Sequence, residues 1–228
     1  MTRTGIIARA ALMGTALVLG SSVLGPSAWA DSLVFDLNQS NLGAGFTGPF
    51  IEVTVDRTST TTATFTFDAL TNGGFTYLMH TNGAAAVNIN AASFTGSVIS
   101  TTNSLAGFSA PSGTFVNPGN EDGFGSFNAG VDLADGFKQS ATEIVFSVIN
   151  TSGTWANVAS VLTPNNDGNI AAAQIGACPV VCNGTTSEFT NTGFAAVPAP
   201  IVGAGLPGVV LACGGLIALA RRRRHLVV

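Results

Sequence analysis

Charged residues and helical patterns are both scarce in this sequence. Only 9% of its 228 residues are charged, against about 25% in a typical globular protein, whereas glycine, threonine, asparagine and serine are plentiful. The central part of the chain also has no convincing stretch with the apolar period of about 3.6 residues that marks an amphipathic helix. Few charges, many turn-forming residues and no helical period indicate a protein built from strands and turns.

Basic residues are almost absent from the middle of the chain. Of the eight basic residues, two lie near the N-terminus and four near the C-terminus, so residues 31–197 contain only Arg57 and Lys138. All twelve acidic residues lie in this central region, which therefore has a net charge of −10. Because binding to a phosphate backbone depends on Lys and Arg, this charge excludes a nucleic-acid partner.

Motifs for nucleophilic and metal catalysis are missing as well. His80 is the only histidine in residues 31–197, so a metal site with several histidines is excluded. The Gly-x-Ser-x-Gly nucleophile motif does not occur either. We expect His80 to be a polar residue at the end of a strand, before a turn, and we assign no catalytic residue and no metal ligand.

Carboxylates are the remaining route to catalysis, because a glycosidase needs only two of them about 5 to 9 Å apart. The densest group in the sequence is Glu121, Asp122, Asp132 and Asp135. Nothing in the sequence marks one pair of these acids above another. Calcium binding is a second use for the same group, since this ion takes Asp and Asn oxygens from turns.

The first thirty residues have the three parts of a secretory signal. Two arginines precede an apolar stretch at residues 10–24, and an Ala-Trp-Ala sequence follows it. This order predicts export through the Sec translocon and cleavage by signal peptidase. An uncleaved anchor is the weaker alternative, because the stretch is shorter than the roughly 20 residues that a membrane span needs. The residues at the cleavage site are Ala28, Ala30 and Asp31.

A second apolar segment lies near the C-terminus. Residues 201–220 contain no charge, and four consecutive arginines follow them. A helix of this length matches the hydrocarbon core of about 30 Å, and a basic cluster directly after a span holds that end in the cytoplasm. The pattern predicts a transmembrane helix, although its glycines and proline suit a processing signal better than a permanent anchor. The basic cluster consists of Arg221, Arg222, Arg223 and Arg224.

The residues around this span resemble a known sorting signal. Val197-Pro198-Ala199-Pro200, the glycine-rich span and the arginine run are similar, in this order, to the PEP-CTERM signal of Gram-negative bacteria. In that family a membrane-embedded cysteine transpeptidase, exosortase, recognises the tail. The resemblance implies cleavage near the proline motif and delivery to the cell surface or the exopolysaccharide matrix, although Ala199 stands where the usual motif has glutamate. Parts of residues 123–196 also resemble uncharacterised proteins with the same tail, and these imply no activity.

Turn signals separate short alternating runs in the central region. Residues 51–56, 63–68 and 143–150 alternate between apolar and polar side chains, as half-buried strands do. Asn-Gly sequences at 72–73 and 82–83 bracket another run, as hairpin turns would. Strands about ten residues apart predict an all-β antiparallel sandwich, of which a jelly roll is one form. The fifteen phenylalanines can supply its interior.

Two cysteines of the exported region are expected to form a disulfide. Cys178 and Cys182 would lie in an oxidising compartment, where paired cysteines are usually bridged. A structural zinc site is the competing interpretation, but two cysteines and one distant histidine are too few ligands. Cys213 lies in the predicted span and should stay separate.

The predicted protein thus has three parts, namely a signal peptide (1–30), an extracellular β-sandwich (31–197) and a sorting tail (198–228). Signal and membrane helices would flank the sandwich. Its surface, low in charge and rich in hydroxyl and amide groups, suits exopolysaccharide or sister molecules as partners. We expect a non-catalytic surface or matrix protein without a cofactor, with calcium as the open alternative, and with Trp155 in the core. A secreted carbohydrate-active enzyme using two carboxylates is the alternative.

Overall fold

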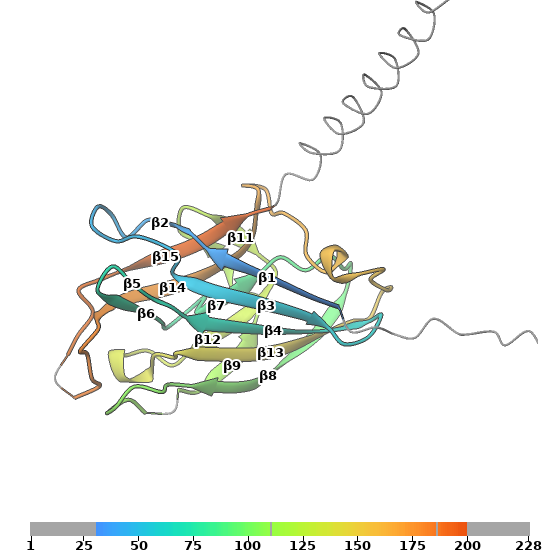
Figure 1. Cartoon of the computed structure of the whole chain (residues 1–228). Helices are drawn as coiled ribbons and strands as arrows, with labels where there is room; N and C mark the ends of the chain where they lie inside the picture. The colour runs from blue at the N-terminus through green and yellow to red at the C-terminus, as the bar shows by residue number, and fades with distance from the viewer. Residues whose placement is uncertain (1–30, 110, 186, 200–228) are drawn as a thin grey trace, which may run out of the picture.

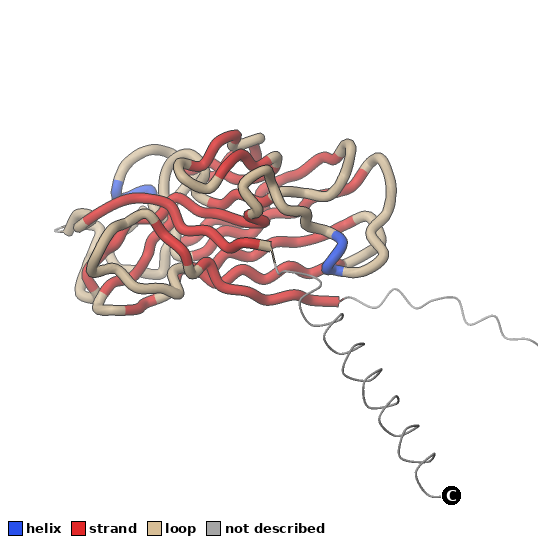
Figure 2. Tube along the Cα trace, turned by 90° about the horizontal axis from the view of Figure 1, so that it is seen from above, coloured by secondary structure: helices blue, strands red, loops and turns tan. Residues whose placement is uncertain are grey.

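The structure, a computed structural model, describes residues 31–109, 111–185 and 187–199. They form two antiparallel sheets packed face to face (Figure 1). The helices among them are two single 3-10 turns, η1 (Phe137–Gln139) and η2 (Val158–Ser160), at opposite ends of the sandwich (Figure 2). The predicted all-β antiparallel sandwich is confirmed.

Several predicted features lie outside the described residues. These are the helices expected at 1–30 and 201–220 and the processing residues Ala28, Ala30, Pro200 and Arg221 to Arg224. In the part of the chain that the structure describes, no helix is long and apolar enough to cross a membrane.

Period-two alternation builds the five-stranded sheet. In β3 and β4 the apolar members Val53 and Phe65 are fully buried, while the threonines between them lie on the outer face. The strands are, in spatial order, β1 (Asp31–Leu37), β3 (Ile51–Arg57), β4 (Thr62–Ala69), β13 (Glu143–Asn150) and β8 (Phe94–Thr102).

The second sheet has eight strands and is rich in alanine. Its main order is β2 (Gln39–Ser40), β15 (Asn191–Pro198), β14 (Asn169–Pro179), β7 (Ala85–Val87), β12 (Ala129–Leu133) and β9 (Gly113–Val116). β6 (Phe75–Met79) pairs with β14, and β5 (Thr71–Asn72) pairs with β6. Because alanines fill β7 and the middle of β14, other chain segments can approach this sheet closely on both faces.

The main core lies between the two sheets. Phe65 stacks on Phe146 with ring centroids 4.9 Å apart, and both face Val131 and Ile175 of the second sheet within one apolar cluster. Each such aromatic side chain contributes roughly 1.5 to 3 kcal/mol on burial. Trp155 joins this core at 2% exposure and donates from its indole N–H to the carbonyl of Asn90 at 2.8 Å. Trp155 is therefore a core residue, as expected, and offers no exposed platform for a sugar.

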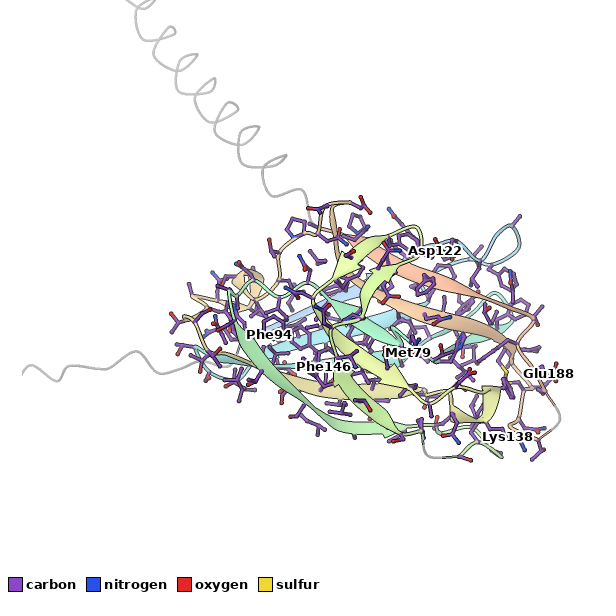
Figure 3. All side chains as sticks on the ribbon, turned by 180° about the vertical axis from the view of Figure 1, so that it is seen from behind. Met79, Phe94, Asp122, Lys138, Phe146 and Glu188 are labelled. Atoms are coloured by element: carbon purple, nitrogen blue, oxygen red, sulfur yellow. A yellow bond between two sulfur atoms is a disulfide. The ribbon has the colours of Figure 1, made fainter. Side chains whose placement is uncertain are left out.

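A small hairpin adds a third layer outside the eight-stranded sheet. It consists of β10 (Gly119–Glu121) and β11 (Gly125–Phe127), seen in Figure 3 with Asp122 beside its turn. Phe124 and Phe127 pack on outward-facing alanines of β7, β14 and β15. The hairpin therefore buries part of the sheet's outer face. It also places Glu121, the last residue of β10, against that face.

The predicted disulfide is confirmed, since Cys178 at the end of β14 is bonded to Cys182. Both cysteines pack with Leu78, Phe137 and Phe189 in a separate apolar cluster. The bond thereby ties the segment after residue 182 to the end of the sandwich that also holds η1.

Candidate functional site

Glu121 and Asp132 meet on the outer face of the eight-stranded sheet. Glu121 ends β10, and its carboxyl lies directly against Gly83, so closely that a Cβ at position 83 would overlap it. Asp132, on the outward face of β12, accepts a hydrogen bond from the Gly83 N–H at its Oδ1 atom, 2.7 Å away. Two carboxyls eleven positions apart in sequence (132 minus 121) are thus gathered around one glycine.

The environment of Glu121 favours its neutral form. Its side chain is only 2% exposed, and no described residue donates a hydrogen bond to its carboxyl. Burial, together with the nearby Asp132 carboxylate, raises the pKa of Glu121 from its ordinary value of 4.5 to about 8. At neutral pH a largely protonated Glu121 therefore stands beside Asp132.

The turn beneath this pair is held in an unusual conformation. Thr81 has φ +51°, and among the described residues no other non-glycine residue has a positive φ. Such a backbone costs roughly 1 to 3 kcal/mol and persists only where its surroundings hold it. Here Leu133 N–H donates to the Thr81 carbonyl at 2.9 Å, and Gln174 N–H donates to the Gly83 carbonyl at 2.8 Å. The neighbouring strands β12 and β14 thus fix the turn on which the carboxyls meet.

The other two acids of the predicted group lie elsewhere. Asp122 is exposed at the hairpin turn, and Asp135 lines a separate cavity near η1. The sequence contained both members of the Glu121–Asp132 pair but no signal that would have selected it. Within the described ranges no three side chains among His, Cys, Asp and Glu are placed to hold a metal ion.

The cavity lies at the disulfide end of the sandwich and has a volume of about 460 Å³. Figure 3 shows Lys138 and Glu188 at this end of the molecule. Phe137 lies in its wall and rests on Phe189 and Phe108, with ring centroids 4.8 and 5.0 Å away. The lining residues are Asp135, Gly136, Phe137, Lys138, Gln139, Gly184, Thr185, Ser187 and Glu188.

The lining of the cavity combines donors, acceptors and one aromatic ring. Lys138 makes no salt bridge within the described chain, whereas Arg57 is bonded to Asp31 at 2.6 Å. Acidic, amide and hydroxyl groups complete a lining that can both donate and accept hydrogen bonds. The sequence carries no local signal of this cavity, since its walls come from two segments about fifty residues apart.

His80 lies behind this cavity rather than in it. It follows β6, is 6% exposed and packs against Phe189 in a tilted arrangement with ring centroids 4.7 Å apart. Its Nε2 atom has no hydrogen-bond partner in the described ranges. Burial lowers the pKa of His80, although the Ile175 backbone and the Asp135 carboxylate partly oppose this. His80 is thus a neutral core residue at a strand end, before the Thr81 turn, as expected.

A row of four carboxylates crosses the outer face of the five-stranded sheet. Asp36, Glu52, Asp68 and Glu143 lie opposite one another in register on β1, β3, β4 and β13. Burial and the Glu143 carboxylate raise the pKa of Asp68. Like charges directly opposite each other destabilise a sheet. This acidic row therefore lowers the free energy of unfolding, and favourable contacts elsewhere in the fold must offset the loss.

The described part also contains four of the predicted processing residues. Asp31 begins β1, where its carboxylate accepts from Arg57 Nε at 2.6 Å and from the Val158 N–H at 2.7 Å. Val197 and Pro198 belong to β15, and the Ala199 N–H donates to the Gly168 carbonyl at 2.8 Å. Both predicted processing points therefore adjoin strands of the sandwich directly.

Family models, curated proteins and solved structures were compared with this chain, and none of them matches it. A proposal about its function must therefore rest on the geometry of its own residues.

Proposed function

We propose that this chain is an exported, non-catalytic protein of the cell surface or the exopolysaccharide matrix, where its sandwich binds polysaccharide. The cavity between η1 and the segment after Cys182 is the observation that carries the binding role. Sugar hydroxyls both donate and accept hydrogen bonds, as the groups of this lining do, and the Phe137 ring offers an apolar face for sugar C–H groups. Glu121 and Asp132 do not line the cavity, which favours binding there over carboxylate catalysis.

The sorting part of the proposal depends on the two ends of the sequence. A Sec-type signal would direct export, signal peptidase would cut before Asp31, and an exosortase would process the tail near Pro198. A signal helix, a membrane helix at 201–220 and a jelly-roll form of the sandwich are further parts of this proposal.

The binding role is tested with purified residues 31–199 and exopolysaccharide from the producing strain. We expect the protein to co-sediment with the polysaccharide, and Phe137→Ala or Asp135→Asn to weaken co-sedimentation several-fold. Asp122→Asn is the matched control, because Asp122 is also an exposed aspartate but lies away from the cavity. Unchanged binding by both cavity variants would contradict the proposal.

A carbohydrate-active enzyme is the second candidate, and the Glu121–Asp132 pair is the observation that favours it. A carboxyl that stays protonated near neutral pH beside a second carboxylate is the arrangement of a general acid and its partner. The measurement is reducing-end release from the same exopolysaccharide. Release by the wild type that disappears in Glu121→Gln and Asp132→Asn, but persists in Asp122→Asn, would replace the binding role with hydrolysis.

A further inference from the structure

We infer that Glu121 and Asp132 form a binding site for a hard divalent cation of the Ca²⁺ type. This site is separate from the proposed saccharide cavity, and it does not depend on the proposed function. Two observations carry it, namely the isolation of the buried Glu121 carboxyl and the gathering of two carboxyls around Gly83.

The first observation is that the described residues supply neither a positive charge nor a hydrogen-bond donor to the Glu121 carboxyl. The side chain is 98% buried, and no described residue donates a hydrogen bond to its carboxyl. Acidic side chains are almost never fully buried unless they are paired or bind a metal. The Glu121 oxygens are not among the fully enclosed side-chain atoms without a partner, of which the described chain has only His80 Nε2, so they remain within reach of an ion or water.

No basic side chain of the described chain can serve as that partner. Arg57 is engaged with Asp31 in the other sheet, and Lys138 lines the cavity beside η1. The charged group that acts on Glu121 is instead Asp132, which has the same sign. A bound cation turns this repulsion into shared attraction, because both carboxylates then contact one positive charge.

The second observation is the chemistry of the atoms gathered around Gly83. Oδ1 of Asp132 is held by the Gly83 N–H, which orients this carboxylate and leaves Oδ2 for a ligand. Carboxylate oxygens, supplemented by neutral oxygens and water, are the ligands that Ca²⁺ takes in flexible geometry. Two carboxylates are few for this ion, so we expect a weak site, with a Kd of about 10⁻⁴ to 10⁻³ M as in extracellular calcium modules.

The backbone beneath the pair is built for a close approach. Gly83 has φ +69° and no side chain, which leaves room for the Glu121 carboxyl. Thr81, two residues earlier, keeps a left-handed conformation between β12 and β14. Strained backbone of this kind often accompanies ligand clamps. Gly83→Ala should therefore displace Glu121 and weaken cation binding without removing a carboxylate.

The test uses residues 31–199, which contain every strand of both sheets, after removal of metals with EDTA. Titration with CaCl₂ is followed by calorimetry and by thermal unfolding, with NaCl of equal ionic strength as the reference. We expect one bound ion per chain and a rise in Tm of roughly 5 °C at about 10 mM CaCl₂. Glu121→Gln and Asp132→Asn should abolish both signals. Glu143→Gln and Asp122→Asn, which change acids elsewhere, should keep them.

Loss of binding through unfolding is distinguished by measuring the variants in EDTA. We expect Glu121→Gln to be at least as stable as the wild type there, because it removes a buried, unbalanced carboxyl. A wild type that shows no calcium heat and no Tm shift would overturn the inference. The same shift in a folded Glu121→Gln variant would overturn it as well. Neither result bears on co-sedimentation with polysaccharide, so the two proposals stand or fall separately.

Discussion

At the scale of single residues, Glu121 couples stability to pH. Its pKa is about 8 in the folded protein and near 4.5 in the unfolded chain, so the folded state holds a proton that the unfolded state has lost between these values. The stability from this group is fully present below about pH 4.5 and is lost as the pH rises through about 8. Asp132 on β12 is the titratable group that faces it, while the Thr81–Gly83 turn supplies none.

The prediction concerns the free energy of unfolding of residues 31–199 in EDTA. It should fall between about pH 5 and about pH 9 by roughly 4 kcal/mol more in the wild type than in Glu121→Gln, because the glutamine does not ionise. Urea unfolding at several pH values measures both profiles. Parallel profiles for the two proteins would contradict the raised pKa.

At the scale of strands, the acidic row on the five-stranded sheet should limit stability. Glu52 lies between Asp36 and Asp68, and none of these three side-chain carboxylates has a hydrogen-bond or ion-pair partner among the described residues. Glu52→Gln removes two unfavourable cross-strand contacts, so we expect the free energy of unfolding to rise by roughly 0.5 to 1 kcal/mol. The gain should shrink in about 1 M NaCl, where charges are screened within about 3 Å.

Glu188→Gln is the control for this experiment, because it makes the same change in a loop away from the row. Urea unfolding at low and high salt compares the two variants. A Glu52→Gln variant less stable than the wild type at low salt would show that the row is not repulsive.

The disulfide stabilises the connection that follows β14. It closes a short loop from Cys178 to Cys182, so a chain-entropy argument gives about 2 kcal/mol of stabilisation. The Cys178→Ala, Cys182→Ala double variant should lose about this much and also bind polysaccharide less well, because the bond ties the cavity segment to the sandwich. Mass spectrometry of the protein isolated from the producing cells or their medium checks the bond itself. Two free thiols there would contradict it.

At the scale of the whole molecule, the tail should be separable from the fold. β15 ends at Pro198, and Ala199 still bonds to Gly168, so a deletion that spares the sandwich must begin at residue 200. We expect deletion of residues 200–228 to leave the sandwich folded and to release the protein into the medium. Cell fractionation with circular dichroism of the released protein measures both effects. Unchanged surface retention would argue against the sorting role.

Local chemistry in the sequence was enough to predict the strands and the disulfide. Residues 51–56 and 63–68 became β3 and β4 because a half-buried strand alternates side chains between core and solvent, whatever its partners are. The Cys178–Cys182 bond was predicted from the short spacing of the two cysteines and from the expected export. The cleavage site, the tail and the membrane span were read from the same kind of local pattern, and they stay predictions.

Only the tertiary structure decided which acids meet. Glu121 contacts Gly83 because Phe124 and Phe127 fold the β10–β11 hairpin onto alanines of three other strands. Asp135, in the same cluster of the sequence, instead faces a cavity. A strand's faces follow from its own alternation, but contacts across a sheet depend on register and on what packs over it. The sequence by itself therefore determined the class of fold. Long-range packing determined the Glu121–Asp132 pair, the acidic row and the cavity.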